Sequence, residues 1–110
     1  MDRIAEELAA LADADLDRVA DVIDALTGAL PEPLTAWVRH LVDQERDGRA
    51  GNVYPLRPPS DVFEDHEYPA CIAAAKRLRG ASIDLASVAL LDVVVEVLAD
   101  YQAGGVAGIR

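Results

Sequence analysis

The last third of the chain contains its longest apolar run, interrupted by acidic residues at regular intervals. Between Ser82 and Tyr101 most positions are Leu, Val, Ile or Ala, and the carboxylates recur at intervals of eight, four and four residues. These carboxylates are Asp84, Asp92, Glu96 and Asp100. On a helix this spacing places them on one narrow stripe. A helix that is apolar around the rest of its circumference requires burial on more than one side. We therefore expect helix 82–101 at the centre of a bundle or at a subunit interface.

Helical periodicity also marks the first thirty residues and the segment after them. Apolar residues recur at spacings of three and four through residues 4–30. An aspartate near residue 13 can cap a new helix, so we favour two helices here over one interrupted helix. Gly28 and Pro31 are expected to end the second helix, and Pro33 is well placed to be the first residue of a third. That third helix has the clearest amphipathic stripe in the chain. Its apolar positions are Leu34, Trp37, Val38, Leu41 and Val42.

The middle of the chain is predicted to be a connector followed by a shorter helix. Residues 53–60 contain three prolines, which lack backbone donors and fix φ, so an extended proline-rich connector is expected there. Asp61 and Glu64 have the spacing of a capping box, which predicts a short helical turn after them. A further helix is expected over residues 70–79, and Gly80 is expected to close it.

These patterns together predict an all-α fold, a compact bundle of about five helices without strand-like alternation. Residues 1–102 are expected to form a single helical domain and residues 103–110 a flexible C-terminal tail. A length of 110 residues is typical of one domain, and a hydrophobic share of 52% is sufficient for its core. Aromatic residues are few, so aliphatic side chains must form most of that core, and Trp37 is expected to be its buried anchor.

Acidic residues outnumber basic residues by 20 to 10, so the net charge is −10. Residues 1–32 have nine acids and two bases, residues 33–80 have seven of each, and residues 81–110 have four acids and one base. The three segments therefore have net charges of −7, zero and −3. This charge repels phosphate backbones and anionic lipid, so neither nucleic acid nor membrane is an expected partner.

The sequence also favours a particular compartment. Cys71 is the single cysteine, which excludes an internal disulfide and fits a reducing cytoplasm. The first residues lack the basic and apolar regions of a signal peptide, and the run 85–99 is too short and too charged to span a membrane. A bias towards Ala and Arg is typical of a GC-rich bacterial genome. We expect a soluble cytoplasmic bacterial protein.

No catalytic, cofactor-binding or metal-binding residue is predicted. His40, His66 and the carboxylates near them lack the spacing of a zinc or calcium motif. Cys71 falls on the apolar side of its helix, as a small buried hydrophobe does. An enzyme or small-ligand binder with an apolar pocket between helices remains open as a third alternative.

The leading functional hypothesis is a non-catalytic protein-interaction or regulatory module that forms a homodimer through helix 82–101 and binds an unidentified protein partner. The candidate interface residues are Val88, Leu91, Val95, Leu98 and, if exposed, Trp37. The main alternative is a small DNA-binding transcriptional regulator that uses the central basic residues. These are Arg39, Arg46, Arg49, Arg57, Lys76, Arg77 and Arg79. Because residues 33–80 are only neutral overall, no binding to duplex DNA is expected near physiological ionic strength.

Overall fold

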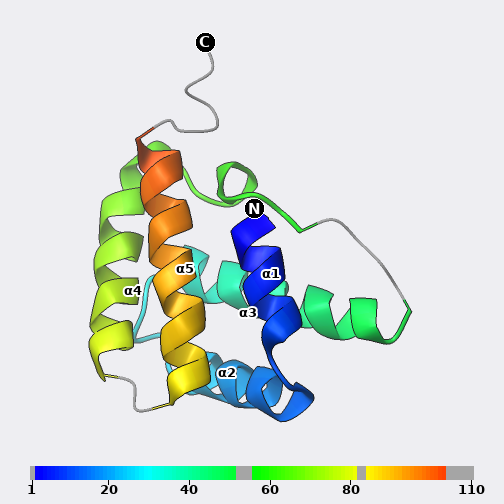
Figure 1. Ribbon diagram of the computed structural model, residues 1–110. Coiled ribbons are helices and arrows are strands. Elements are labelled where there is room, and N and C mark those ends of the chain that lie inside the picture. The colour runs from blue at the N-terminus through cyan, green and yellow to red at the C-terminus, as the bar shows by residue number, and fades with distance from the viewer. Residues whose placement is uncertain (1, 52–55, 82–83, 104–110) are drawn as a thin grey trace.

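The computed structural model describes residues 2–51, 56–81 and 84–103, and this part of the chain is all-α, as predicted (Figure 1). It contains five α-helices and two short 3-10 helices, and no strand occurs within these residues. The elements are α1 (Asp2–Ala10), α2 (Asp13–Ala25), α3 (Glu32–Arg49), η1 (Pro59–Asp61), η2 (Asp65–Glu67), α4 (Tyr68–Ala81) and α5 (Leu85–Gln102). Residues 53–55 of the predicted connector and 104–110 of the predicted tail lie outside the described residues.

The C-terminal helix α5 packs against α4, α1 and α2 and keeps one exposed stripe. α4 and α5 run antiparallel side by side, and α1 packs along α5 on the side away from α4 (Figure 1). α2 and α3 run across these helices, and α2 contacts both α3 and α5. The expectation of a central position for α5 is therefore confirmed. Within the described residues, no helix is both long enough and apolar enough to cross a membrane.

The first two helices are separate, as favoured from the sequence. The break falls at Leu11 and Ala12, and Ala12 has an extended backbone with φ −69° and ψ 158°. No side chain caps the start of α2, but Asp13 and Asp15 lie in its first turn, where negative charge interacts favourably with the helix dipole. Gly28 has a φ of +96°, a conformation that other residues rarely adopt, and it lies in the turn that follows α2.

Three helix boundaries differ from the predicted ones. α3 begins at Glu32 after Pro31, so Pro33 is its second residue rather than its first. The capping box is formed by Glu64 and Glu67 instead of Asp61 and Glu64. There the Glu67 carboxylate accepts a hydrogen bond of 2.8 Å from the backbone N–H of Glu64. α4 begins at Tyr68 and continues through Gly80 to Ala81, because one glycine weakens a helix by only about 1 kcal/mol relative to alanine and does not stop it.

Part of the predicted connector is helical. The 3-10 helix η1 begins at Pro59, where the fixed φ of proline suits the start of a helical turn. Residues 56–58 have no regular structure, and they pass close to α3. The contact is made by Trp37, whose indole Nε1–H donates a hydrogen bond of 2.9 Å to the backbone carbonyl of Arg57. The expectation of an extended segment is thus correct for Pro58, which has φ −72° and ψ 156°, and wrong for η1.

Trp37 is the buried anchor that the amphipathic stripe of α3 predicts. Its side chain is 1% exposed. Its ring contacts Phe63 edge to face, with centroids 5.6 Å apart and planes at 80°, and Phe63 in turn contacts Tyr68 at 5.6 Å. This aromatic cluster joins α3 to the segment before α4 and to the first turn of α4. A hydrogen-bonded indole inside an aromatic cluster is a strong packing contact.

The N-terminus of α5 is fixed by side-chain hydrogen bonds. The Asp84 carboxylate accepts bonds from the backbone N–H of Ser87 at 3.1 Å and from the Ser87 hydroxyl at 2.7 Å. Arg18 of α2 donates a third bond of 2.9 Å to the same carboxylate. The bonds from Ser87 and Arg18 hold the pKa of Asp84 below its usual value, with Ser87 as the larger cause. Asp84 is therefore the helix cap and not part of the exposed stripe predicted for this helix.

Candidate interaction surface

The residues predicted to form an apolar interface are mostly inside the bundle. Leu91, Val95 and Leu98 of α5 are at most 7% exposed, and Val88 is half-buried. Trp37, the fifth candidate, lies in the aromatic cluster described above. These side chains are covered by the chain's own helices because α5 is central. The expected exposed apolar patch is therefore not formed by these residues, and the homodimer remains a prediction that they do not support.

The seven predicted basic residues do not converge on one surface. Arg39, Arg46 and Arg49 lie on α3, whereas Lys76, Arg77 and Arg79 lie on α4. The C-terminal end of α3 and the helix α4 are at opposite sides of the molecule (Figure 1). Arg57 belongs to the segment that contacts Trp37. A single basic surface for a DNA backbone is therefore not assembled from these seven side chains.

The basic residues of α3 hold α2 in place. Each of the three arginines pairs with an aspartate near or in α2: Arg39 with Asp24 at 2.8 Å, Arg46 with Asp17, and Arg49 with Asp13 at 2.7 Å. Their charges are thus paired with the acidic face of the N-terminal segment, which explains part of the excess of aspartate there. Ion pairs of this exposure contribute little individually, but together they fix the relative position of two helices.

Arg49 has an additional structural role at the end of α1. Its Nη2 donates hydrogen bonds to the backbone carbonyls of Leu8 at 2.9 Å and Leu11 at 2.6 Å. The last carbonyls of a helix lack partners within the helix, so this guanidinium caps α1 from a distant part of the chain. Hydrogen bonds to Glu45 first, and then to Asp13, raise the pKa of Arg49. Arg49 is therefore bound within the fold and is not available to a partner.

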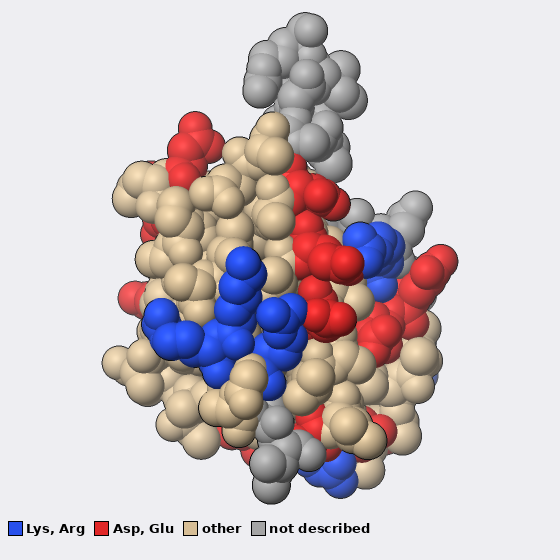
Figure 2. Space-filling view, turned by 60° about the vertical axis from the view of Figure 1, so that its left-hand side comes forward, with Lys and Arg blue, Asp and Glu red and all other residues tan. Residues whose placement is uncertain are grey.

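The basic residues of α4 form a separate patch on the surface. We call Lys76, Arg77 and Arg79 the basic patch. Figure 2 shows basic side chains gathered over α4, beside a vertical column of acidic side chains. Lys76 and Arg77 are exposed, and neither has an ion pair with any residue that the structure describes. Arg79 donates to Asp92 of α5 at 2.7 Å and so joins the patch to the neighbouring helix.

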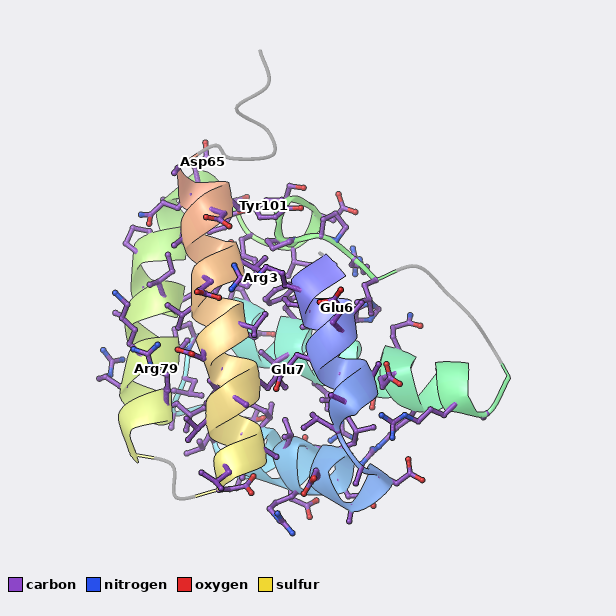
Figure 3. All side chains as sticks on the ribbon, viewed as in Figure 1. Arg3, Glu6, Glu7, Asp65, Arg79 and Tyr101 are labelled. Carbon is purple, nitrogen blue, oxygen red and sulfur yellow. The ribbon has the colours of Figure 1, made fainter. Side chains whose placement is uncertain are left out.

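The acidic side chains beside the patch belong to α5. We call Asp92, Glu96 and Asp100, which are all exposed, the acidic column, and the patch and column together the α4–α5 face. Arg3 of α1 pairs with Glu96, and Arg79 of α4 reaches Asp92, so the two arginines approach α5 from opposite sides (Figure 3). The sequence correctly predicted this stripe, apart from Asp84. Its position next to the basic patch depends on the antiparallel packing of α4 and α5, which no sequence pattern revealed.

Among the residues weighed for catalysis or metal binding, Cys71 is buried and His66 is exposed. Cys71 is 1% exposed, and burial, with a smaller contribution from Glu67, raises the pKa of its thiol, which opposes formation of the nucleophilic thiolate. His66 lies beside Glu64, with Nδ1 at 3.4 Å from the carboxylate. Across residues 2–51, 56–81 and 84–103, no three His, Cys, Asp or Glu side chains are grouped so that they could hold a metal ion.

Two of the cavities in the described structure offer little to a ligand. The apolar cavity between α2, α3, α4 and α5 has a volume of about 10 Å³, close to the space of one water molecule. A larger hollow of about 350 Å³ lies between α2 and α3, but it is lined by the paired side chains of Asp13, Asp17, Arg46 and Arg49. These charges already satisfy one another. The third alternative, an apolar inter-helix pocket for a ligand, therefore gains no support from these two cavities.

Within the α4–α5 face, Lys76, Arg77 and Asp100 have no ion pair with any residue that the structure describes, whereas Arg79, Asp92 and Glu96 are paired within the chain. No protein-family model, curated protein or solved structure matches this chain.

Proposed function

We propose that this protein is a non-catalytic protein-interaction module and that the α4–α5 face is its docking surface. One observation carries the proposal: Lys76 and Arg77 are exposed neighbours without an ion pair to any described residue. Among those residues, the arginines that are paired with carboxylates are Arg3, Arg18, Arg39, Arg46, Arg49 and Arg79. In a chain of net charge −10, two adjacent unpaired cations form a distinct electrostatic feature that can select and orient a partner.

The shape of the same surface is compatible with close docking. Next to the cations along α4, the exposed residues are small, namely Pro69, Ala70 and Ala73. Small side chains let a second backbone approach closely, and apolar area next to charges resembles the organisation of known protein interfaces.

Two further features support a binding role rather than a catalytic one. The Cys71 thiol is buried with a raised pKa, and the apolar cavity holds about 10 Å³. We place the protein in the cytoplasm, where a single free thiol remains reduced. Many of the charged side chains of the described chain form ion pairs or helix caps, which stabilise structure.

Site-specific photocrosslinking in the native host tests the proposal. A photoreactive residue at Ala73, on the α4–α5 face, is expected to give one defined adduct. The same residue at the exposed Ala25 of α2 is the matched control and is expected to give none. The adduct should disappear when Lys76→Glu and Arg77→Glu are introduced together. Equal labelling at both positions, no adduct at Ala73, or an adduct unaffected by the two substitutions would contradict the proposed docking surface.

A further inference from the structure

We infer that the partner bound by the α4–α5 face is a second copy of this chain. This inference rests on the proposed function and names its partner. The basic patch has three cations and the adjacent acidic column has three carboxylates, so the face is balanced although the chain is at −10 (Figure 2). A polyanion would be repelled by the acidic half of such a face. An identical face complements both halves at once.

Two-fold symmetry brings the opposite halves together. In a symmetric dimer the same surface is used by both subunits, so that residue i of one contacts residue j of the other and j contacts i. Consider an axis that lies between α4 and α5 and runs parallel to them. It places α4 of each copy against α5 of the other. Each basic patch then faces an acidic column, and the two contacts are equivalent.

The levels of the charged residues along the helices also match. The Arg79–Asp92 ion pair, at 2.7 Å, shows which turns of α4 and α5 are adjacent. Because the helices are antiparallel, Lys76, about one turn before Arg79, is level with Glu96, about one turn after Asp92. An axis parallel to the helices leaves these levels unchanged. Lys76 of one copy is thus opposite Glu96 of the second copy.

The carboxylates of the column can bind a cation from a second copy. The Asp92 side chain remains 63% exposed and that of Glu96 remains 49% exposed, although both are paired within the chain. A carboxylate has about four acceptor positions, so one arginine does not exhaust it. The ion pairs with Arg79 and Arg3 also orient the two carboxylates before the second copy arrives.

The size of the face predicts a weak, reversible dimer. α4 has 14 residues and α5 has 18, which correspond to lengths of about 21 and 27 Å. Two helices of about 10 Å diameter give a face of roughly 400–550 Å² per copy, or roughly 800–1,100 Å² in total. Stable interfaces begin near about 1,200 Å². The association is therefore expected at micromolar to millimolar concentrations.

Charge reversal on the two halves tests this arrangement. One variant combines Lys76→Glu with Arg77→Glu, and the other combines Asp92→Lys with Glu96→Lys. Each alone opposes like charges across the dimer, so we expect both to be monomeric by sedimentation velocity where the wild type associates. In an equimolar mixture the reversed patch of one variant meets the reversed column of the other, and the second contact is unchanged. We expect the mixture to associate at least tenfold more tightly than either variant alone.

The control is Asp21→Lys with Asp47→Lys, which changes the net charge as the column variant does but lies on exposed positions of α2 and α3. It should associate like the wild type. Circular dichroism tests whether each variant is folded. If the Asp92→Lys, Glu96→Lys variant is unfolded, the Lys76→Glu, Arg77→Glu variant alone decides: its loss of association supports the dimer, and association like that of the wild type contradicts it. A monomeric wild type at millimolar concentration, or a mixture no tighter than its components, overturns the self-association. If the self-association is overturned but the photoreactive residue at Ala73 forms an adduct with a different protein, the proposed function still stands and only this inference fails.

Discussion

Replacement of Trp37 by alanine is expected to lower the free energy of unfolding by about 3–5 kcal/mol. A buried indole removes roughly 150–250 Å² from water, which at about 25 cal/mol per Å² corresponds to roughly 4–6 kcal/mol. The edge-to-face contact with Phe63, at 5.6 Å, and the hydrogen bond to the Arg57 carbonyl add to this value. Partial collapse of neighbouring side chains into the cavity offsets part of the loss.

The variant Trp37→Phe separates packing from hydrogen bonding. It keeps a ring near Phe63 but leaves the Arg57 carbonyl without its donor, so we expect a loss of about 1–2 kcal/mol. Urea unfolding followed by far-ultraviolet circular dichroism measures all three proteins, since the variants lack the fluorophore. In the wild type, which has one tryptophan, the emission should be that of a buried indole. An alanine variant that loses less than about 1 kcal/mol, or wild-type emission like that of indole in water, would refute the assignment of Trp37 as the anchor.

Substitutions at three other residues test individual contacts. Asp84→Ala should destabilise the protein by about 1–2 kcal/mol because α5 loses its cap, Asp84→Asn should recover part of this, and equal urea midpoints for Ala and wild type would contradict the cap. Burial, and secondly the nearby Arg57, lowers the pKa of His40 in the folded protein. As the pH falls, His40 is therefore protonated in the unfolded state before it is protonated in the folded state. The contribution of His40 to the free energy of unfolding should thus be complete above pH about 6.5 and decline below it. Urea midpoints measured between pH 8 and 5.5 should show this decline in the wild type and not in His40→Gln. Identical pH profiles for the two proteins would show that His40 is not responsible. Arg49→Met should increase hydrogen exchange in α1, whose terminal carbonyls lose their donor, and unchanged protection of α1 would exclude this capping role.

Much of the fold follows from local patterns that the packing then reinforces. The 3.6-residue periodicity of residues 34–42 identified α3 and its anchor, and the nearly uniform apolar surface of α5 indicated its central position. The start of α4 was harder to predict from the sequence because two possible capping signals occur before it. Asp61 and Glu64 have the spacing of a cap, but the chain uses Glu64 and Glu67, since Pro59 starts a separate turn.

The candidate site could be predicted only in part. The acidic stripe of α5 and the basic cluster of residues 76–79 are both evident in the sequence. Their adjacency is a tertiary property, because it depends on the antiparallel packing shown by the Arg79–Asp92 ion pair. The same limitation explains the error over Leu91 and Val95, whose apolar character is equally compatible with a core or an interface. It also explains why the sequence alone leaves Arg46 and Arg49 as candidates for DNA binding, since their aspartate partners are 29 and 36 residues away in sequence.

The central claim is that the chain associates with itself through the α4–α5 face. Amide chemical shifts of the unmodified protein, recorded from about 10 μM to 1 mM across the range expected for a weak interface, test it most directly. We predict that concentration-dependent shifts concentrate at residues 73–77 of α4 and 89–96 of α5, while the exposed residues of α2 and α3 remain unchanged. Spectra that do not change over this range, or changes centred on α2 and α3, would contradict the claim.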